Sequence, residues 1–477
     1  MSNTSANTPA GQRINALLDP GSFVEIAGGV TSRSTDFNDG AAKEASDGVI
    51  TGYGLMDGRL VYVYSQNAAV MNGTVGEMHA KKIIHLYNMA MKMGAPVIGL
   101  LDSAGFRLTE ATDALEALSR LYYKQTMASG VVPQISAVFG TCGGGLAVSA
   151  ALSDFVFMDG ENGRLFMNAP NAIPGNNEQA FDPSKADFQS GKGGNVDYVG
   201  TEGEILGAIR QLVALLPSNS SENDSYEECT DDLNRLVDVA NAADDPAIIA
   251  YHLADNNLFF ETKKDYAKDM MTGFLRLGGQ TVGVVANRAK VYGADGEIED
   301  CLAGLTPFGC NKAAGFVSFC DAFEIPVLTL SNVDGFHANK WAEQGLAKTA
   351  ARLVAAIANA SVPKINVVTG KLMGSAYSIM NSKALGADMV YAWNDAKVGM
   401  MDPEMAAKIL NPDANAEVLK EKKAEYAEKL ASAASACARG YVDALIDPAQ
   451  TRKYLIGAFD MLLSKQEERP FKKHVTK

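Results

Sequence analysis

Short apolar stretches alternate along the chain with longer amphipathic ones. This pattern predicts strands at 96–101, 133–139 and 364–369 and helices at 78–93 and 345–358. Strands that alternate with helices are typical of an α/β fold in which helices cover parallel sheets. A later segment, 418–438, is rich in Ala, Glu and Lys and contains neither Gly nor Pro, which predicts one or two surface helices.

The second half of the chain repeats the first. Residues 132–147 read VPQISAVFGTCGGGLA, and residues 362–377 read VPKINVVTGKLMGSAY. Residues 95–106, APVIGLLDSAGF, likewise match residues 325–336, IPVLTLSNVDGF. Both matches are offset by 230 residues, and a similar hairpin pattern opens each half. The chain is therefore expected to contain two homologous units.

Length and composition fit two domains. A chain of 477 residues, 47% of them hydrophobic, can bury two cores of about 230 residues each. The polar run at 217–225 indicates the exit from the first half, and a helical connection from about Thr230 is expected to lead into the second. We place the boundary near Asp244, which gives domains 1–243 and 244–477.

Charge and composition exclude several functions. A formal net charge of −14 argues against nucleic acid as a partner, because phosphate binding needs a basic surface. The sequence shows no leader peptide and no run of eighteen apolar residues, so a cytoplasmic location is expected. No Cys-x-x-Cys or His-x-x-x-His pair is present, so no metal site is expected. His79 and His85, in one predicted helix, are interpreted as surface or interface residues.

Each glycine-rich turn brings small residues to the point where a buried strand gives way to a helix. Two adjacent backbone N–H groups can then point into one spot, and such an arrangement stabilises an oxyanion. A single turn of this kind could be only a tight packing turn, but its duplication favours a chemical role. Neither turn matches a P-loop or a dinucleotide fingerprint. Ser375 lacks the flanking glycines of a nucleophile elbow, because Met373 and Tyr377 stand there.

Several short motifs occur in the order and spacing of a known family. They are RINALLDPGSF at 13–23, DGVITG at 47–52, SQN at 65–67 with GE at 76–77, DSAG at 102–105, the two glycine turns, GAD at 386–388 and ARGYVD at 438–443. Together they resemble the carboxyltransferase subunits of biotin-dependent acyl-CoA carboxylases and decarboxylases, over almost the whole chain. The resemblance implies two tandem crotonase-like domains, the first on the acyl-CoA side and the second on the biotin side.

The resemblance also implies a reaction, the transfer of CO2 between carboxybiotin and the α-carbon of an acyl-CoA. It assigns the thioester oxygen to the backbone N–H groups of Gly144 and Gly145, and the ureido oxygen of biotin to those of Ser375 and Ala376. The residues implied to contact biotin or the coenzyme A ester are Gly143, Gly374, Ser103, Gly105 and Phe336. No side-chain acid or base is implied, because the ureido nitrogen takes the α-proton.

The resemblance further implies partner proteins. Biotin arrives on a separate biotin carboxyl carrier protein, and the other partners are a biotin carboxylase or membrane decarboxylase subunits, through which the chain would reach a membrane. A homohexamer of three dimers is implied, with the helix at 346–358 as a candidate dimer surface, and no metal is implied for this subunit.

The tetrapeptide AMKM at 90–93 matches the biotin attachment sequence of carriers. It ends a predicted helix, however, so we interpret the match as coincidental.

The acyl group and the direction of transfer stay open at the level of sequence. In relatives the position of Ser378 influences acyl size, and serine there does not distinguish acetyl-CoA/malonyl-CoA from the favoured propionyl-CoA/methylmalonyl-CoA. One alternative is the carboxyltransferase subunit of a sodium-pumping decarboxylase, such as glutaconyl-CoA decarboxylase. Others are a non-catalytic scaffold subunit and a crotonase-type hydratase, which would normally have one domain. The loop at 333–343, with His337, departs from the family pattern, and its effect on biotin binding is also open.

Overall fold

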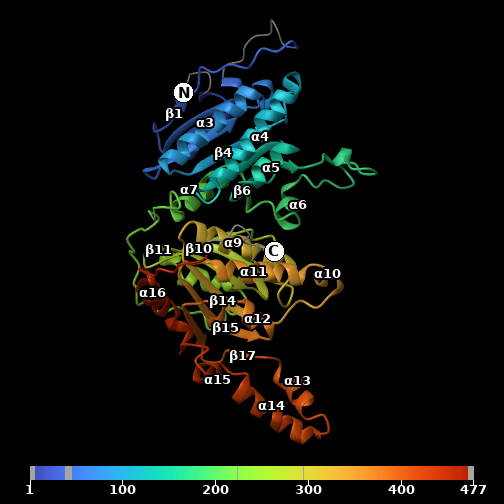
Figure 1. Ribbon diagram of the computed structural model, residues 1–477, viewed down its shortest axis with the longest axis vertical. Helices are drawn as coiled ribbons and strands as arrows, with labels where there is room; N and C mark the ends of the chain where they lie inside the picture. The colour runs from blue at the N-terminus through green and yellow to red at the C-terminus, as the bar shows by residue number, and fades with distance from the viewer. Residues whose placement is uncertain (1–5, 38–45, 223, 294, 471–477) are drawn as a thin grey trace. The chain divides into compact units, whose positions relative to one another are not determined.

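The computed structural model describes residues 6–37, 46–222, 224–293 and 295–470 (Figure 1). The chain divides into two compact units, residues 1–225 and 226–477. Each unit is built around an eight-stranded sheet with helices packed against it. The prediction of a duplicated α/β fold is therefore confirmed.

The sheet of the first unit runs in the order β1-β2-β3-β4-β5-β6-β8, and β7 pairs with the end of β5. The first three strands are antiparallel and the others parallel. The strands are β1 (Val24–Ile26), β2 (Val49–Met56), β3 (Arg59–Gln66), β4 (Val97–Ser103), β5 (Gln134–Gly143), β6 (Phe155–Asp159), β7 (Arg164–Phe166) and β8 (Tyr198–Gly200). The helices are α2 (Pro9–Leu17), α3 (Glu77–Met93), α4 (Ala111–Ala128), α5 (Gly145–Ala151), α6 (Ala186–Gly191) and α7 (Glu202–Leu215).

The sheet of the second unit runs in the order β18-β16-β15-β14-β11-β10-β9, and β17 pairs with the end of β15. Its strands are β9 (Phe259–Thr262), β10 (Met270–Leu277), β11 (Gln280–Asn287), β14 (Val327–Asp334), β15 (Lys364–Met373), β16 (Met389–Trp393), β17 (Lys397–Gly399) and β18 (Ala444–Ile446), and a separate hairpin joins β12 (Lys290–Tyr292) to β13 (Ile298–Asp300). The helices are α8 (Pro246–Leu253), α9 (Pro307–Ala322), α10 (Lys340–Glu343), α11 (Leu346–Asn359), α12 (Ser375–Ile379), α13 (Pro403–Leu410), α14 (Ala416–Leu430), α15 (Ala433–Ala438) and α16 (Thr451–Leu462).

The repeat extends to strand register. β4 pairs with β5 in parallel, and the register shifts between Leu101 and Ser103. β14 pairs with β15 in the same way, and the register shifts between Ser331 and Val333. Because the carboxyl ends of parallel strands meet at one edge of a sheet, each unit brings the ends of these two strands together. The glycine turns stand at that edge in both units.

Helix α3 illustrates how sequence pattern sets the local structure. Its buried side chains recur every three or four residues, so one face packs into the core of the first unit. Gly94, with φ of 62°, adopts the left-handed conformation that ends the helix. The AMKM tetrapeptide thus forms the last turn of a helix, as interpreted. The predicted surface segment at 418–438 forms α14 and α15, and no residue of α14 is buried.

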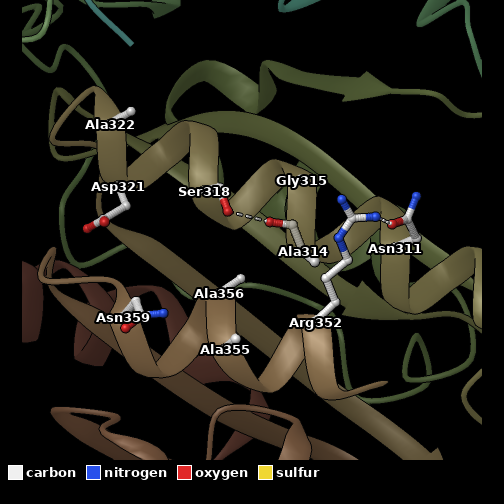
Figure 2. Close-up of a pocket in the computed structure, with 10 residues that line it drawn as sticks. All are labelled: Asn311, Ala314, Gly315, Ser318, Asp321, Ala322, Arg352, Ala355, Ala356 and Asn359. Atoms are coloured by element: carbon white, nitrogen blue, oxygen red, sulfur yellow. Dashed lines mark hydrogen bonds between the residues drawn. The ribbon is translucent and has the colours of Figure 1, made fainter. Parts of the chain in front are cut away.

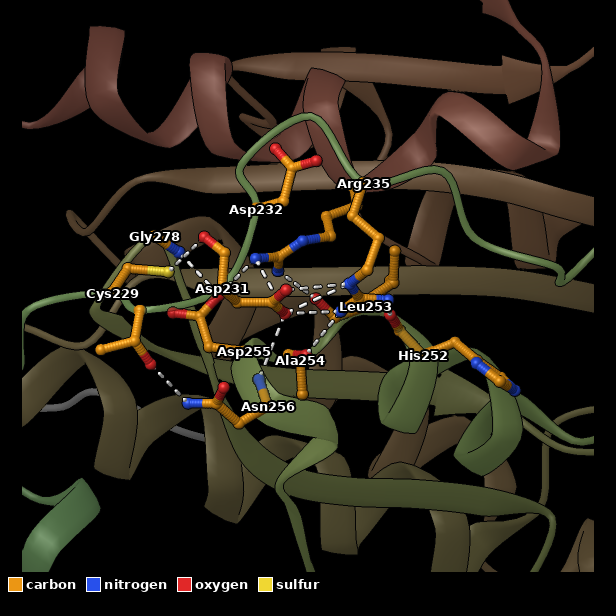
Figure 3. Close-up of polar contacts among 12 residues, drawn as sticks. Cys229, Asp231, Asp232, Arg235, His252, Leu253, Ala254, Asp255, Asn256 and Gly278 are labelled. Carbon is orange, nitrogen blue, oxygen red and sulfur yellow. Dashed lines mark hydrogen bonds and ion pairs between the residues drawn. The ribbon is translucent and has the colours of Figure 1, made fainter.

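The boundary between the units falls at 225/226 rather than at 243/244, and the expected helical connection is irregular. Figure 3 shows the polar contacts that attach this connection to the second unit. Arg452 of α16, fully buried, donates to the Leu253 carbonyl at 2.5 Å and to Asp255 at 2.8 Å. Asp231 accepts from Arg235 at 2.8 Å and lies 3.5 Å from Arg452. The Arg452 pairs join segments far apart in the sequence, and composition does not reveal them.

Candidate active site

The two glycine turns have the same backbone conformation. Gly144 has φ of 59° and ψ of −130°, and Gly374 has φ of 61° and ψ of −151°. A residue with a Cβ atom is strained at these angles, so glycine is required at both positions. Each glycine ends a buried strand and starts a short helix, α5 or α12.

The hydrogen bonds of the two turns also match. The N–H of Gly144 donates to the carbonyl of Phe166 at 2.8 Å, and the N–H of Gly374 donates to the carbonyl of Gly399 at 2.9 Å. Those carbonyls lie at the ends of β7 and β17. The resemblance implied the N–H of Gly144 as an oxyanion donor, and in this structure that N–H donates to an acceptor of the protein itself.

The two N–H groups that follow Gly144 and the two that follow Gly374 differ from the N–H groups of these glycines. Gly145 and Leu146 begin α5, and Ser375 and Ala376 begin α12. The first N–H groups of a helix have no acceptor in the preceding turn. Within the described parts of the chain, none of these four N–H groups donates to a protein acceptor. Each unit therefore presents two adjacent donors at the carboxyl edge of its sheet.

The surroundings of the two turns differ. A Cβ atom built on Gly145 would lie 2.9 Å from Leu118 Cδ2 and from the hydroxyl oxygen of Tyr122, and 3.0 Å from Phe106 Cζ. The equivalent residue of the second unit is Ser375, whose side chain is exposed. The first turn is thus enclosed by an aliphatic and two aromatic side chains, and the second is open.

The other predicted site residues lie on the same two edges. Ser103 ends β4 and is buried, and its hydroxyl accepts from the N–H of Gly105 at 3.2 Å. A Cβ atom on Gly143 would lie 2.6 Å from the ring of Phe166, so this position also needs glycine. Phe336 follows β14 as Phe106 follows β4. Phe106 forms a bridge to Val75, just before α3, and Phe336 forms one to Leu305, just before α9. Phe336 is 40% exposed.

A buried ion-pair network, which sequence reasoning missed, holds the loop that carries Phe106. Arg107 donates to Asp47 at 2.6 Å, to Glu110 at 2.7 Å and to the carbonyl of Thr74 at 2.7 Å. All three charged side chains are at most 5% exposed. Burial raises the pKa of Asp47, and the Arg107 guanidinium opposes that rise. The DG motif at 47–48 had marked Asp47 in the sequence, but nothing had marked its partner Arg107.

His79 is fully buried, so its interpretation as a surface or interface residue is wrong. Its Nδ1 lies 3.0 Å from the carbonyl oxygen of Asp47, and its Nε2 lies 3.2 Å from the amide nitrogen of Gln66. Burial, followed by the nearby charge of Arg107, lowers the pKa of His79 to about 3. The imidazole is therefore neutral and serves the fold. His85, on the same helix, is exposed as expected.

This burial predicts acid sensitivity. Between pH 6.5 and about 3 the unfolded chain binds a proton at His79 that the folded chain does not, so stability falls as the pH falls. His79→Gln should lower the slope of unfolding free energy against pH by about 1.4 kcal/mol per pH unit between pH 4 and 6. Urea unfolding at several pH values measures this slope. The matched variant His85→Gln should leave the slope unchanged, and equal slopes for all three proteins would contradict the assignment.

One hollow lies in the second unit and another in the first. One, of 480 Å³, lies between α9 and α11 and is lined mainly by small and polar side chains (Figure 2). No turn residue lines it. The other, of 190 Å³, adjoins the first turn and is mostly apolar, with Ala147, Val148 and Ala151 of α5 facing Leu165, Phe166 and Met167. Its position and lining suit an apolar group better than a charged one.

Among the described residues, no three His, Cys, Asp or Glu side chains come together as a metal ion would require. Over the same ranges, no helix combines the length and the apolar character needed to cross a bilayer.

Comparison with known proteins extends the sequence resemblance. The carboxyl transferase domain family matches residues 5–476. The propionyl-CoA carboxylase beta chain of Roseobacter denitrificans is 40% identical over 98% of this chain and 92% of its own length. Methylmalonyl-CoA decarboxylase subunit alpha of Veillonella parvula is 37% identical over 98% of this chain and 92% of its own length.

A solved structure agrees with these relatives. The structure of transcarboxylase 12S, a hexamer with hydrolysed methylmalonyl-CoA bound, matches with a TM-score of 0.91 at 33% identity. The match covers 99% of this chain and 93% of that one. The similarity spans both units, so the prediction of two tandem crotonase-like domains is confirmed.

Proposed function

Because the chain belongs to the carboxyl transferase domain family, we propose that it moves a carboxyl group between carboxybiotin and the α-carbon of an acyl-CoA. Propionyl-CoA/methylmalonyl-CoA is the proposed substrate pair, ahead of acetyl-CoA/malonyl-CoA. The observation that carries the proposal is the pair of equivalent turns, each with two adjacent N–H groups that have no acceptor in the described chain. Two oxyanions form in the reaction, and the chain offers two places to stabilise them.

In this proposal the first unit takes the thioester. The α-proton of the acyl-CoA leaves as charge moves to the thioester oxygen, which the N–H groups of Gly145 and Leu146 stabilise. Gly144 shapes the turn, as Gly374 does in the second unit. The apolar hollow beside α5 would receive part of the acyl-CoA chain.

The second unit takes biotin, which supplies the carboxyl group and, at its ureido nitrogen, the acceptor for the α-proton. The N–H groups of Ser375 and Ala376 would face the ureido oxygen. The open turn fits this assignment, because a biotin carried by another protein must reach it from solvent and Ser375 is exposed. Phe336, half-exposed after β14, is the proposed apolar contact at the same edge.

Partners decide the direction of transfer. We propose a biotin carboxyl carrier protein, together with a biotin carboxylase or membrane decarboxylase subunits, and a homohexamer like that of transcarboxylase 12S. The similarity to a propionyl-CoA carboxylase beta chain supports carboxylation. The similarity to a methylmalonyl-CoA decarboxylase subunit, at nearly the same identity, supports the decarboxylating alternative. Both turns are intact, which disfavours a non-catalytic scaffold.

The test is carboxyl exchange by the purified protein. The assay would offer free biotin with malonyl-CoA, methylmalonyl-CoA or glutaconyl-CoA, and mass spectrometry would follow the loss of each ester. Biotin-dependent turnover of methylmalonyl-CoA is expected. If none of the esters reacts, even with a biotinylated carrier protein and with a folded oligomer confirmed, the proposed function fails.

A further inference from the structure

Tyr122 contacts the first turn from a neighbouring helix. It lies on α4, is partly buried, and its hydroxyl donates a hydrogen bond to the backbone carbonyl of Gly145. The hydroxyl oxygen would lie only 2.9 Å from a Cβ atom on Gly145, so the phenol packs directly against this residue. Burial raises the pKa of Tyr122, and the hydroxyl therefore keeps its proton at neutral pH.

The carbonyl of Gly145 and the N–H of Leu146 belong to one peptide group. In a trans peptide these two bonds lie in one plane and point in opposite directions. A hydrogen bond that fixes the carbonyl of Gly145 therefore also fixes the direction of the Leu146 N–H. Donation to the carbonyl also polarises the peptide, which makes the N–H a better donor.

A second contact separates the role of Tyr122 from the docking of α5. One turn further along α4, the side chain of Gln125 donates to the Ser149 carbonyl at 3.1 Å and accepts from the Ser149 hydroxyl at 2.8 Å. Gln125 is fully buried and also connects α4 to β5 through Gln134. Helix α5 thus stays attached to α4 without the Tyr122 hydroxyl, which acts only on the first peptide of the helix.

Among the described residues of the second unit, no equivalent tyrosine contact comes from the corresponding helix, α11. Helix α11 contains no tyrosine, and the residue that the 230-residue offset pairs with Tyr122 is Arg352, which donates to Asn311. The tyrosine contact is therefore specific to the turn that is enclosed, and it is not a general requirement of the duplicated fold.

We propose that Tyr122 is a positioning residue for the thioester half of the reaction. Its hydroxyl orients the Gly145–Leu146 peptide so that the Leu146 N–H meets the oxyanion of the enolate. The inference rests on the proposed function, because it concerns a donor of the thioester site.

The test compares Tyr122→Phe with Tyr123→Phe. The ring of Tyr122 is kept and only the hydroxyl is lost, whereas Tyr123 is the adjacent residue and is 64% exposed. Tyr122→Phe should lower kcat for methylmalonyl-CoA with free biotin by about tenfold, with KM within about twofold of the wild type. Tyr123→Phe should leave both constants unchanged. Size-exclusion chromatography and thermal melting establish that both variants fold and assemble as the wild type does.

Two further measurements separate positioning from structural support. A nitronate analogue of the propionyl-CoA enolate should bind Tyr122→Phe about tenfold more weakly, because it carries oxyanion charge. S-propyl-CoA, a thioether without a carbonyl, should bind both proteins equally. Replacing Tyr122 by p-aminophenylalanine restores a donor and should recover most of the rate.

The outcomes distinguish the inference from the function on which it rests. If the wild type turns over methylmalonyl-CoA and folded Tyr122→Phe keeps its kcat, the positioning role is overturned and the function stands. Equal losses of nitronate and thioether binding would also overturn the role, because they would indicate a damaged pocket. If the wild type itself turns over no ester, the proposed function fails first.

Discussion

Gly144→Val is expected to lower kcat of carboxyl transfer by at least about 10²-fold while the oligomer still forms. Gly144 has φ of 59° and ψ of −130°, a conformation that a β-branched residue adopts only with strain of about 1–3 kcal/mol. A Cβ atom there would meet no atom within 4 Å, so the effect comes from the backbone and not from a clash. The turn relieves the strain by rotating the peptides that carry the N–H groups of Gly145 and Leu146.

The matched control is Gly58→Val. Gly58 lies in the turn between β2 and β3, has φ of 79°, and also has no atom within 4 Å of its Cβ position. It should lose similar stability and keep its kcat, because no site residue lies in this turn. Steady-state kinetics, melting and size-exclusion chromatography of both variants provide the comparison. Near wild-type activity of Gly144→Val would remove the first turn from the thioester site.

Sequence predicted the architecture because the architecture is duplicated. An offset of 230 residues preserved over two strands and a turn predicts two copies of one fold, whatever the accuracy of each strand assignment. The two sheets repeat even the register shift near Ser103 and Val333. The helix limits were predicted within a few residues, because Gly94 and the apolar periodicity of α3 are local signals.

The donors that we propose for the first turn needed the structure. The N–H of Gly144 donates to Phe166, which lies on β7, a three-residue strand too short for a clear signal in the sequence. A sequence signal nevertheless existed, because the same offset pairs Gly144 with Gly374 and Leu146 with Ala376. The resemblance assigned Gly144 and Gly145 in the first turn but Ser375 and Ala376 in the second, so the two assigned pairs differ by one position at this offset.

Buried charges were the second feature that local pattern could not predict. Arg107 meets Asp47 across 60 residues of chain, and Arg452 meets Asp255 across 197. Single charged residues look like surface residues until the fold supplies their partners. The same reason explains why His79 was interpreted as a surface residue.

Deleting one donor of the second turn should also have a large effect. Ala376 is fully buried and is the second residue of α12, and proline fits the backbone of a first helical turn but has no N–H. Ala376→Pro should therefore lower biotin-dependent transfer by about 10²- to 10³-fold. Binding of the acyl-CoA, measured by calorimetry, should stay unchanged, because in the proposed function the thioester site lies in the first unit.

The comparison with Ala376→Gly isolates the N–H. This variant loses the buried methyl group and keeps the donor, so it should retain most of the transfer rate although it melts at a lower temperature. Replacing Ala376 by lactic acid removes the N–H without a proline ring and should match Ala376→Pro. A loss of acyl-CoA binding in the proline and ester variants, with biotin use intact, would show that the two sites are exchanged. In that case the enclosed turn next to Tyr122 would be the one that receives biotin.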